Sequence, residues 1–134
     1  MMTIKTDRLD IRQSDDVVRV RQLARTFAVE VGLGLVDQTK IITAASELAR
    51  NTLDYGGGGQ ATAEIVENVG RRGLKLTFED QGPGIADIET ALKDGFTSGK
   101  GMGLGLGGAR RLSNEFHIDS KPGIGTRITI VRWK

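Results

Sequence analysis

The first half of the chain repeats apolar residues every three or four positions. Between residues 14 and 31, charged residues fill the gaps in this pattern, which predicts an amphipathic helix capped by Ser14 or Asp15 and ended by Gly32. Residues 36–54 have the same spacing and predict a second helix, which runs into four successive glycines. Before these helices, residues 1–11 carry a few spaced apolar side chains and predict an edge strand.

The second half alternates apolar and polar residues over short segments, as half-buried strands do. Glycines between residues 70 and 73 indicate one hairpin, and the run Pro122-Gly123-Ile124-Gly125 indicates another turn. Between them we predict a short helix at 86–93, a loop at 95–103 and a helix at 104–114. The predicted strands are 61–69, 74–79, 117–120 and 126–133.

Two helices followed by a run of strands predict an α+β fold. We expect a two-layer α/β sandwich, in which a mixed β-sheet carries the helices on one face. The 134 residues suit one domain, 1–134, and there is no internal repeat or low-complexity stretch.

Composition narrows the possible functions. There is no Cys and a single His, His117, which excludes disulfides, thiolate metal sites and multi-histidine zinc sites. Nineteen Lys and Arg against 17 Asp and Glu give a net charge of +2 without a basic stripe, so nucleic acid is not an expected partner. No run reaches the roughly 18 apolar residues of a membrane span, and residues 1–13 are too polar for a secretory signal. We therefore expect a cytoplasmic protein without membrane contact.

Glycine is unusually frequent, and its positions suggest phosphate binding. Twelve of the 19 glycines lie at 56–59, at Gly82 and Gly84, and between 99 and 108. A Walker A loop is absent. Residues 103–108 match the dinucleotide fingerprint formally, but polar residues rather than a strand precede them. Length and the missing His-Arg-Asp and Asp-Phe-Gly elements exclude a eukaryote-type protein kinase.

Two carboxylates and an amide are the candidate side chains. Glu47 and Asn51 share one helix face; the amide oxygen suits phosphate-bound Mg²⁺ and the carboxylate can take a proton. Asp80 ends an apolar strand, so its partly buried carboxylate would accept from the exocyclic amine of adenine, while Gly82 and Gly84 let the backbone turn against the ring. Taken singly, a solvated surface pair and an ordinary strand-end aspartate are the alternatives.

The glycine run at 101–107 is the third candidate element. It offers successive backbone N–H groups and the start of a helix, both suited to phosphate, and a neighbouring lysine could add charge. An ordinary surface loop is the alternative. The nucleotide-binding candidates here are Lys100, Gly101, Met102, Gly103, Leu104 and Gly105.

These three elements, in this order, resemble the GHKL (Bergerat) ATP-binding fold of sensor histidine kinases, gyrase B and MutL over residues 41–133. The resemblance implies ATP and Mg²⁺ as cofactors. It implies that Asn51 chelates Mg²⁺, that Asp80 with its two glycines binds adenine, and that the run at 101–105 belongs to the ATP lid. Thr126 lies where the family often places a hydroxyl near the adenine.

Within that family, the spacing Glu47-x-x-x-Asn51 resembles the anti-sigma factor and switch-protein serine kinases. The similar segments are 36–38, 46–51, 73–75, 79–85, 94–96, 111–112 and 115–116. This implies an ATP-dependent protein serine/threonine kinase with Glu47 as base, a STAS-domain protein as substrate and a PP2C-type phosphatase as a second partner.

The alternative function is a nucleotide-gated, anti-sigma-like binding module without important turnover, in which Glu47 would not be needed. The glycine run resembles the lids of sensor kinases more than those of the switch-protein kinases. We nevertheless expect a serine/threonine kinase and not a histidine kinase, because the sequence shows no helix with a phosphoacceptor His ahead of these motifs. His117 lies on a predicted strand, where a structural role is expected.

Overall fold

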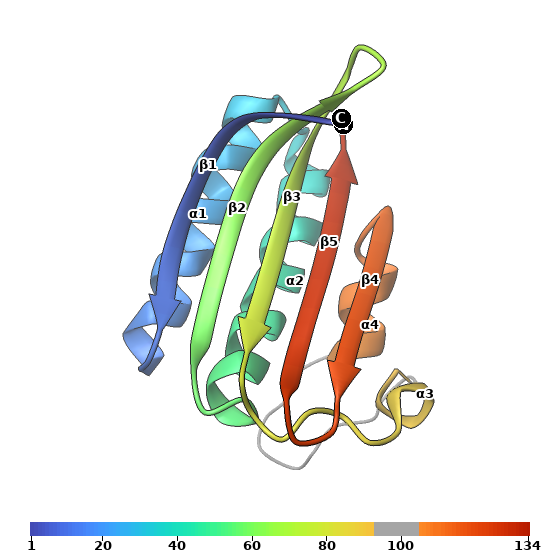
Figure 1. Ribbon diagram of the computed structural model, residues 1–134. Coiled ribbons are helices and arrows are strands. Elements are labelled where there is room, and N and C mark those ends of the chain that lie inside the picture. The colour runs from blue at the N-terminus through green and yellow to red at the C-terminus, as the bar shows by residue number, and fades with distance from the viewer. Residues whose placement is uncertain (93–104) are drawn as a thin grey trace.

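The computed structural model of the protein describes residues 1–92 and 105–134. Within them, five strands form one sheet in the order β1-β2-β3-β5-β4, and the helices cover one face of it (Figure 1). The elements, in chain order, are β1 (Met2–Ile11), α1 (Ser14–Val31), α2 (Leu35–Asp54), β2 (Gly59–Asn68), β3 (Arg71–Asp80), α3 (Ile88–Ala91), α4 (Gly105–Arg111), β4 (Glu115–Lys121) and β5 (Gly125–Trp133). The predicted α+β class, with helices on one face, is confirmed.

Neighbouring strands in this sheet are all antiparallel, so the expectation of a mixed sheet was wrong in that respect. The connections explain the difference. Only residues 32–34 join α1 to α2, so the two helices fold back on each other and return the chain to the end of the sheet where β1 stopped. β2 therefore runs opposite to β1, and the β2–β3 and β4–β5 hairpins continue the alternation.

The two ends of α1 illustrate how well local signals predict boundaries. Gly32 ends the helix as predicted, with a left-handed φ of 90° that glycine adopts without strain. At the start, Gln13 is the cap residue instead of Ser14 or Asp15. The cap was missed because Gln is not a typical capping residue, whereas Ser and Asp are.

The two later helices, α3 and α4, are shorter than predicted. α3 begins only at Ile88 because Asp87 caps it, accepting a hydrogen bond from Thr90 N at 3.1 Å. α4 ends at residue 111 instead of 114, because the N–H of Asn114 already donates to Val131 O of β5 at 2.9 Å. The predicted loop at 95–103 lies outside the described residues.

The core lies between the sheet and the helices. Alternate residues of the central strands point into this layer and meet the apolar stripes of α1 and α2. No helix in the described ranges combines the length and apolar character that a membrane crossing requires. The largest fully buried side chains are Phe78, Ile11, Ile41, Leu48, Leu74, Ile130 and Val66.

Trp133 is the last residue of β5, and its side chain lies on the face of the sheet that the helices leave uncovered. Its ring packs on Gly73, where a Cβ would come within 2.6 Å of it. The guanidinium of Arg71 stacks 5.6 Å from the ring centroid, and the indole N–H donates to Glu115. The single tryptophan is therefore held by β3, β4 and β5 together.

Arg132 directly precedes Trp133, but its side chain lies on the helix side of the sheet, where it joins α2 to α4. Its Nη2 donates to Asp37 Oδ1 at 2.7 Å near the start of α2, and its Nη1 donates to Leu112 O at 3.2 Å just after α4. The side chain is only 13% exposed. This mostly buried cation fixes both helices to β5 at one end of the sandwich.

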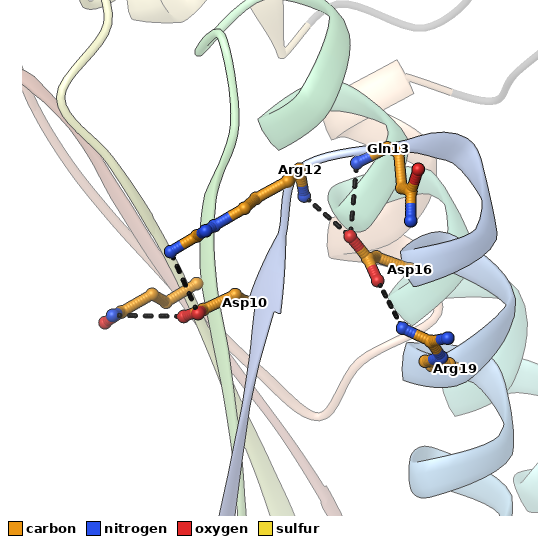
Figure 2. A network of polar contacts seen from close by, with 6 residues as sticks. Asp10, Arg12, Gln13, Asp16 and Arg19 are labelled. Carbon is orange, nitrogen blue, oxygen red and sulfur yellow. Dashed lines mark hydrogen bonds and ion pairs between the residues drawn. The ribbon is translucent and has the colours of Figure 1, made fainter.

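Asp16 holds the turn from β1 into α1 (Figure 2). One carboxylate oxygen accepts the backbone N–H groups of Arg12 at 2.9 Å and Gln13 at 3.1 Å, and the other accepts from the Arg19 guanidinium at 2.9 Å. The N–H of Arg12, with help from those of Gln13 and Arg19, lowers the pKa of Asp16 from its ordinary value, although burial opposes the shift.

We expect Asp16→Asn to flatten the acid dependence of folding stability. Because the pKa of Asp16 is lowered in the folded protein, its carboxylate stabilises the fold above the ordinary aspartate pKa of about 3.9. That contribution is lost as the pH falls through the lowered folded value. Urea titrations between about pH 6 and pH 2 should therefore show a steeper acid loss for the wild type than for Asp16→Asn.

Asp15→Asn is the matched control, since Asp15 is also in the first turn of α1 but is exposed. It should keep the wild-type acid dependence. Parallel curves for the wild type and Asp16→Asn would contradict the assignment.

Candidate functional site

A pocket of about 740 Å³ opens where the C-terminal half of α2 passes the ends of β3 and β5. α3 and the start of α4 contribute its other side, at the lower end of the sheet in Figure 1. Small-molecule sites usually have volumes of roughly 300–1,000 Å³. Apolar side chains from all these elements and from the loop after β3 line it, namely Leu48, Phe78, Ile85, Ala91, Leu106 and Ile128.

α2 presents Glu47, Arg50 and Asn51 to this pocket. On the adjoining face of the helix, Leu48 and Thr52 are buried, and Thr52 Oγ1 donates to Leu48 O at 2.8 Å. Because that face is fixed in the core, the side chains of Glu47 and Asn51 are held toward the pocket. Both therefore lie at the same site, as predicted, and their chemical roles stay predictions.

Asp80 lies at the end of β3, where its half-buried carboxylate lines the pocket. Burial raises the pKa of Asp80, and the backbone N–H groups of Gly82 and Thr126 partly oppose the shift. Gly82 N donates to Asp80 Oδ1 at 2.9 Å. Gly82 therefore binds the carboxylate through its backbone N–H but does not itself line the pocket. Since a carboxylate has about four acceptor sites, Asp80 keeps acceptor capacity for a donor inside the pocket.

Gly56 was not predicted as a site residue, yet it determines whether Asp80 fits. A Cβ on Gly56 would lie 2.4 Å from Asp80 Cγ, closer than any real contact. Gly84 is equally constrained: its φ is 76°, and a Cβ there would lie 2.4 Å from Lys121 O. The glycine cluster at 56–59 was visible in the sequence, but the contact with a side chain 24 positions away was not.

Thr126 lines the pocket from β5, directly opposite Asp80 in the strand register. On its other side it pairs with Ser120 of β4, and the two hydroxyl oxygens are 2.8 Å apart. Ser120 Oγ also accepts the N–H of Ile85 at 2.8 Å. Asp80, Thr126 and Ser120 therefore form a polar row across three strands. Ser120 was missed because the register of the last hairpin is not readable from spacing.

Of the predicted phosphate-binding run at 100–105, only Gly105 is among the described residues. Gly105 lines the pocket as the first residue of α4, with a φ of 69°. His117 is exposed on β4 and is not among the lining residues. Arg50 is the one basic residue among the described residues that line the pocket. The candidates Lys100, Gly101, Met102, Gly103 and Leu104 lie outside the described residues.

The arrangement fits an adenine nucleotide. Phe78 and Ile128 give the pocket apolar walls, and Asp80 supplies a half-buried acceptor suited to an exocyclic amine. The glycines at 56 and 82 leave room for that carboxylate. Asn51 and Arg50 supply an amide oxygen and a cation on the helix side of the pocket, which are groups that suit a phosphate chain and its metal ion.

Two curated proteins are similar to this chain over most of its length. The serine/threonine-protein kinase RsbT of Bacillus subtilis (strain 168) is 50% identical over 118 residues, which cover 88% of this chain and 89% of RsbT. The anti-sigma F factor of Bacillus licheniformis is 28% identical over 127 residues, which cover 91% of this chain and 86% of that protein.

Two solved structures share the fold. The RsbU and RsbW domains of Rv1364c from Mycobacterium tuberculosis superpose with a TM-score of 0.68 at 19% identity, covering 97% of this chain and 33% of that one. The mycobacterial sensor histidine kinase MprB superposes with a TM-score of 0.56 at 18% identity, covering 96% of this chain and 97% of that one. At these identities the likeness concerns the fold alone.

The sequence model for histidine kinase-, DNA gyrase B- and HSP90-like ATPases matches residues 36–134, which include every described residue that lines the pocket. The predicted GHKL resemblance is thereby confirmed, and half of the aligned residues are shared with RsbT. The chain belongs to the histidine kinase-, DNA gyrase B- and HSP90-like ATPases, in the part of that family that includes RsbT.

Proposed function

We propose that this serine/threonine-protein kinase transfers the γ-phosphate of ATP to a Ser or Thr of a STAS-domain protein. The observation that carries the proposal is that Glu47, Asn51, Asp80 and Thr126, from three separate elements, line one pocket. Similarity to RsbT, which is named a serine/threonine-protein kinase, supports the reaction. We add a PP2C-type phosphatase as a second partner and place the protein in the cytoplasm, where ATP is available.

Each residue has one task in this reaction. Asp80 accepts a hydrogen bond from the adenine amine, and Thr126 lies beside it. Asn51 contributes a single ligand to Mg²⁺, which is bound together with the phosphates of ATP. Without phosphate, no group of three or more His, Asp or Glu side chains in the described part of the chain could hold the ion. Glu47 takes the proton of the acceptor hydroxyl. The hydroxyl oxygen of the Ser or Thr bonds to the γ-phosphorus as the bond between that phosphorus and ADP breaks. Catalysis of this kind is mostly positioning and charge neutralisation.

The second candidate function is a nucleotide-gated binding module. Similarity to the anti-sigma F factor of B. licheniformis favours it, because that name describes action against a sigma factor and not phosphoryl transfer. Glu47 separates the two functions, since holding a partner needs no base.

The direct experiment incubates the protein with radiolabelled ATP, Mg²⁺ and a STAS-domain protein, with the kinase alone as control. Label on a Ser or Thr of the STAS-domain protein supports the proposal. ATP-dependent capture of that protein without transfer would favour the binding module. Binding of neither ATP nor the STAS-domain protein would overturn both.

We expect Asp80→Asn to weaken ATP binding more than tenfold. The amide oxygen forms a weaker, uncharged hydrogen bond with the adenine amine, which costs about 1.5–3 kcal/mol. Calorimetry on the folded variant measures the change. Glu79→Gln is the matched control, because Glu79 is the preceding residue on the opposite face of the sheet and does not line the pocket. Unchanged ATP affinity in Asp80→Asn would remove the adenine assignment.

We expect Glu47→Gln and Asn51→Ala to fail at different steps, although both side chains line the same pocket. Glu47→Gln should bind ATP as well as the wild type, while phosphoryl transfer falls roughly 10²–10⁴-fold, the usual contribution of a positioned base. Asn51→Ala should weaken Mg²⁺-dependent ATP binding and therefore every later step. Binding by calorimetry and transfer of label are measured on the same preparations.

Asp54→Asn controls for loss of negative charge, because Asp54 lies on the same helix and lines the same pocket. It should transfer phosphate at close to the wild-type rate. If Glu47→Gln does so too, Glu47 is not the base and the case for a kinase over a binding module loses its main support.

A further inference from the structure

Ser120 lies behind the pocket wall and joins three segments of the chain. It is on β4, is half-buried, and is not among the residues that line the pocket. Its hydroxyl oxygen lies 2.8 Å from Thr126 Oγ1, 2.8 Å from Ile85 N and 3.3 Å from Gly125 O. Ile85 and Thr126 both line the pocket, so Ser120 contacts two wall residues without reaching the interior.

The hydrogen-bonding capacity of Ser120 matches these neighbours. A serine hydroxyl has one proton to donate and two lone pairs to accept with. The N–H of Ile85 takes one lone pair. Gly125 O, at 3.3 Å, is beyond the usual O–H···O range of about 2.5–3.0 Å, whereas Thr126 is within it. When Ser120 donates to Thr126, the Thr126 hydroxyl keeps its own proton for a group in the pocket.

The contact with Ile85 fixes the loop that follows Asp80. That loop is also held where Gly123 N donates to Pro83 O at 2.8 Å, and it packs so closely on β4 that Gly84 has no room for a Cβ. Ser120 is the side chain that ties this loop and the Thr126 hydroxyl to the same strand.

We propose that Ser120 is a positioning residue for the adenine side of the nucleotide pocket, acting through the Thr126 hydroxyl and the Ile85 backbone. The inference deepens the proposed kinase function and rests on it. Ser120 pre-orders one wall before the nucleotide arrives, so that less ordering is needed on binding. The wall that it orders is separate from α2, which carries Glu47 and Asn51.

The experiment compares Ser120→Ala with the wild type in ATP binding and in phosphoryl transfer to the STAS-domain protein. We expect the dissociation constant for ATP, measured by calorimetry, and the KM for ATP to rise about threefold to tenfold, the scale of one or two hydrogen bonds. The kcat at saturating ATP should stay within about twofold, because the base and the metal ligand are untouched. A general loss of structure would lower kcat as well.

A double-mutant cycle shows whether Ser120 acts through Thr126. In a Thr126→Val background, Ser120→Ala should weaken ATP binding clearly less than in the wild type, because its target hydroxyl is gone. Ser120→Thr restores the hydroxyl and should return ATP affinity to within about twofold of the wild type. Should Ser120→Ala not fold, Ser120→Cys keeps the size with a much weaker hydrogen-bonding group and takes its place.

Ser113→Ala is the matched control. Ser113 is also half-buried, and its hydroxyl donates to Ala109 O at 2.8 Å, but neither residue lines the pocket. Its loss should leave ATP affinity unchanged. The inference is overturned if Ser120→Ala binds ATP like the wild type, if kcat falls with affinity, or if its effect is the same with and without the Thr126 hydroxyl. A wild-type protein that binds no ATP would instead refute the proposed function.

Discussion

The half-buried carboxylate of Asp80, at the end of a central strand, constrains the chain around it. An acidic group removed from water needs donors close by, and the backbone N–H groups of Gly82 and Thr126 supply them. It also needs space, so residue 56 has to be glycine. The strand order contributes too: placing β5 beside β3 brings Thr126 opposite Asp80. Much of the local architecture thus serves to keep one acceptor available inside a pocket.

α2 and α4 also line this pocket, and both helices are held in place by contacts away from it. Near the other end of the sandwich, Arg132 binds the first turn of α2 through Asp37 and the residue after α4 through Leu112. Replacing one partner of such a mostly buried cation leaves the charge incompletely satisfied, which is costly. The helix that presents Glu47 and Asn51 is therefore anchored at one end by an ion pair and along its length by the core.

The features that the sequence predicted are those that local chemistry determines. The spacing of apolar residues predicted α1 with its observed bounds, and a spacing of four placed Glu47 and Asn51 on one face. The features it did not predict depend on contacts that form only in the folded chain. Gly56 meets Asp80 only in the folded chain, and Ser120 meets Thr126 only through the register of the last hairpin. Strand direction followed from how α1 and α2 fold back, which periodicity does not encode.

The position of Trp133 has a practical consequence for spectroscopy. It is the single tryptophan, and it is packed against Gly73 and Arg71 on the uncovered face of the sheet. Thr126 is seven residues away along β5, which corresponds to roughly 23 Å of extended strand. Fluorescence of Trp133, excited where tyrosine does not absorb, should therefore report the unfolding of the sheet while remaining insensitive to nucleotide. The protein carries its own folding probe, and occupancy of the pocket has to be followed by another signal, such as the heat of binding.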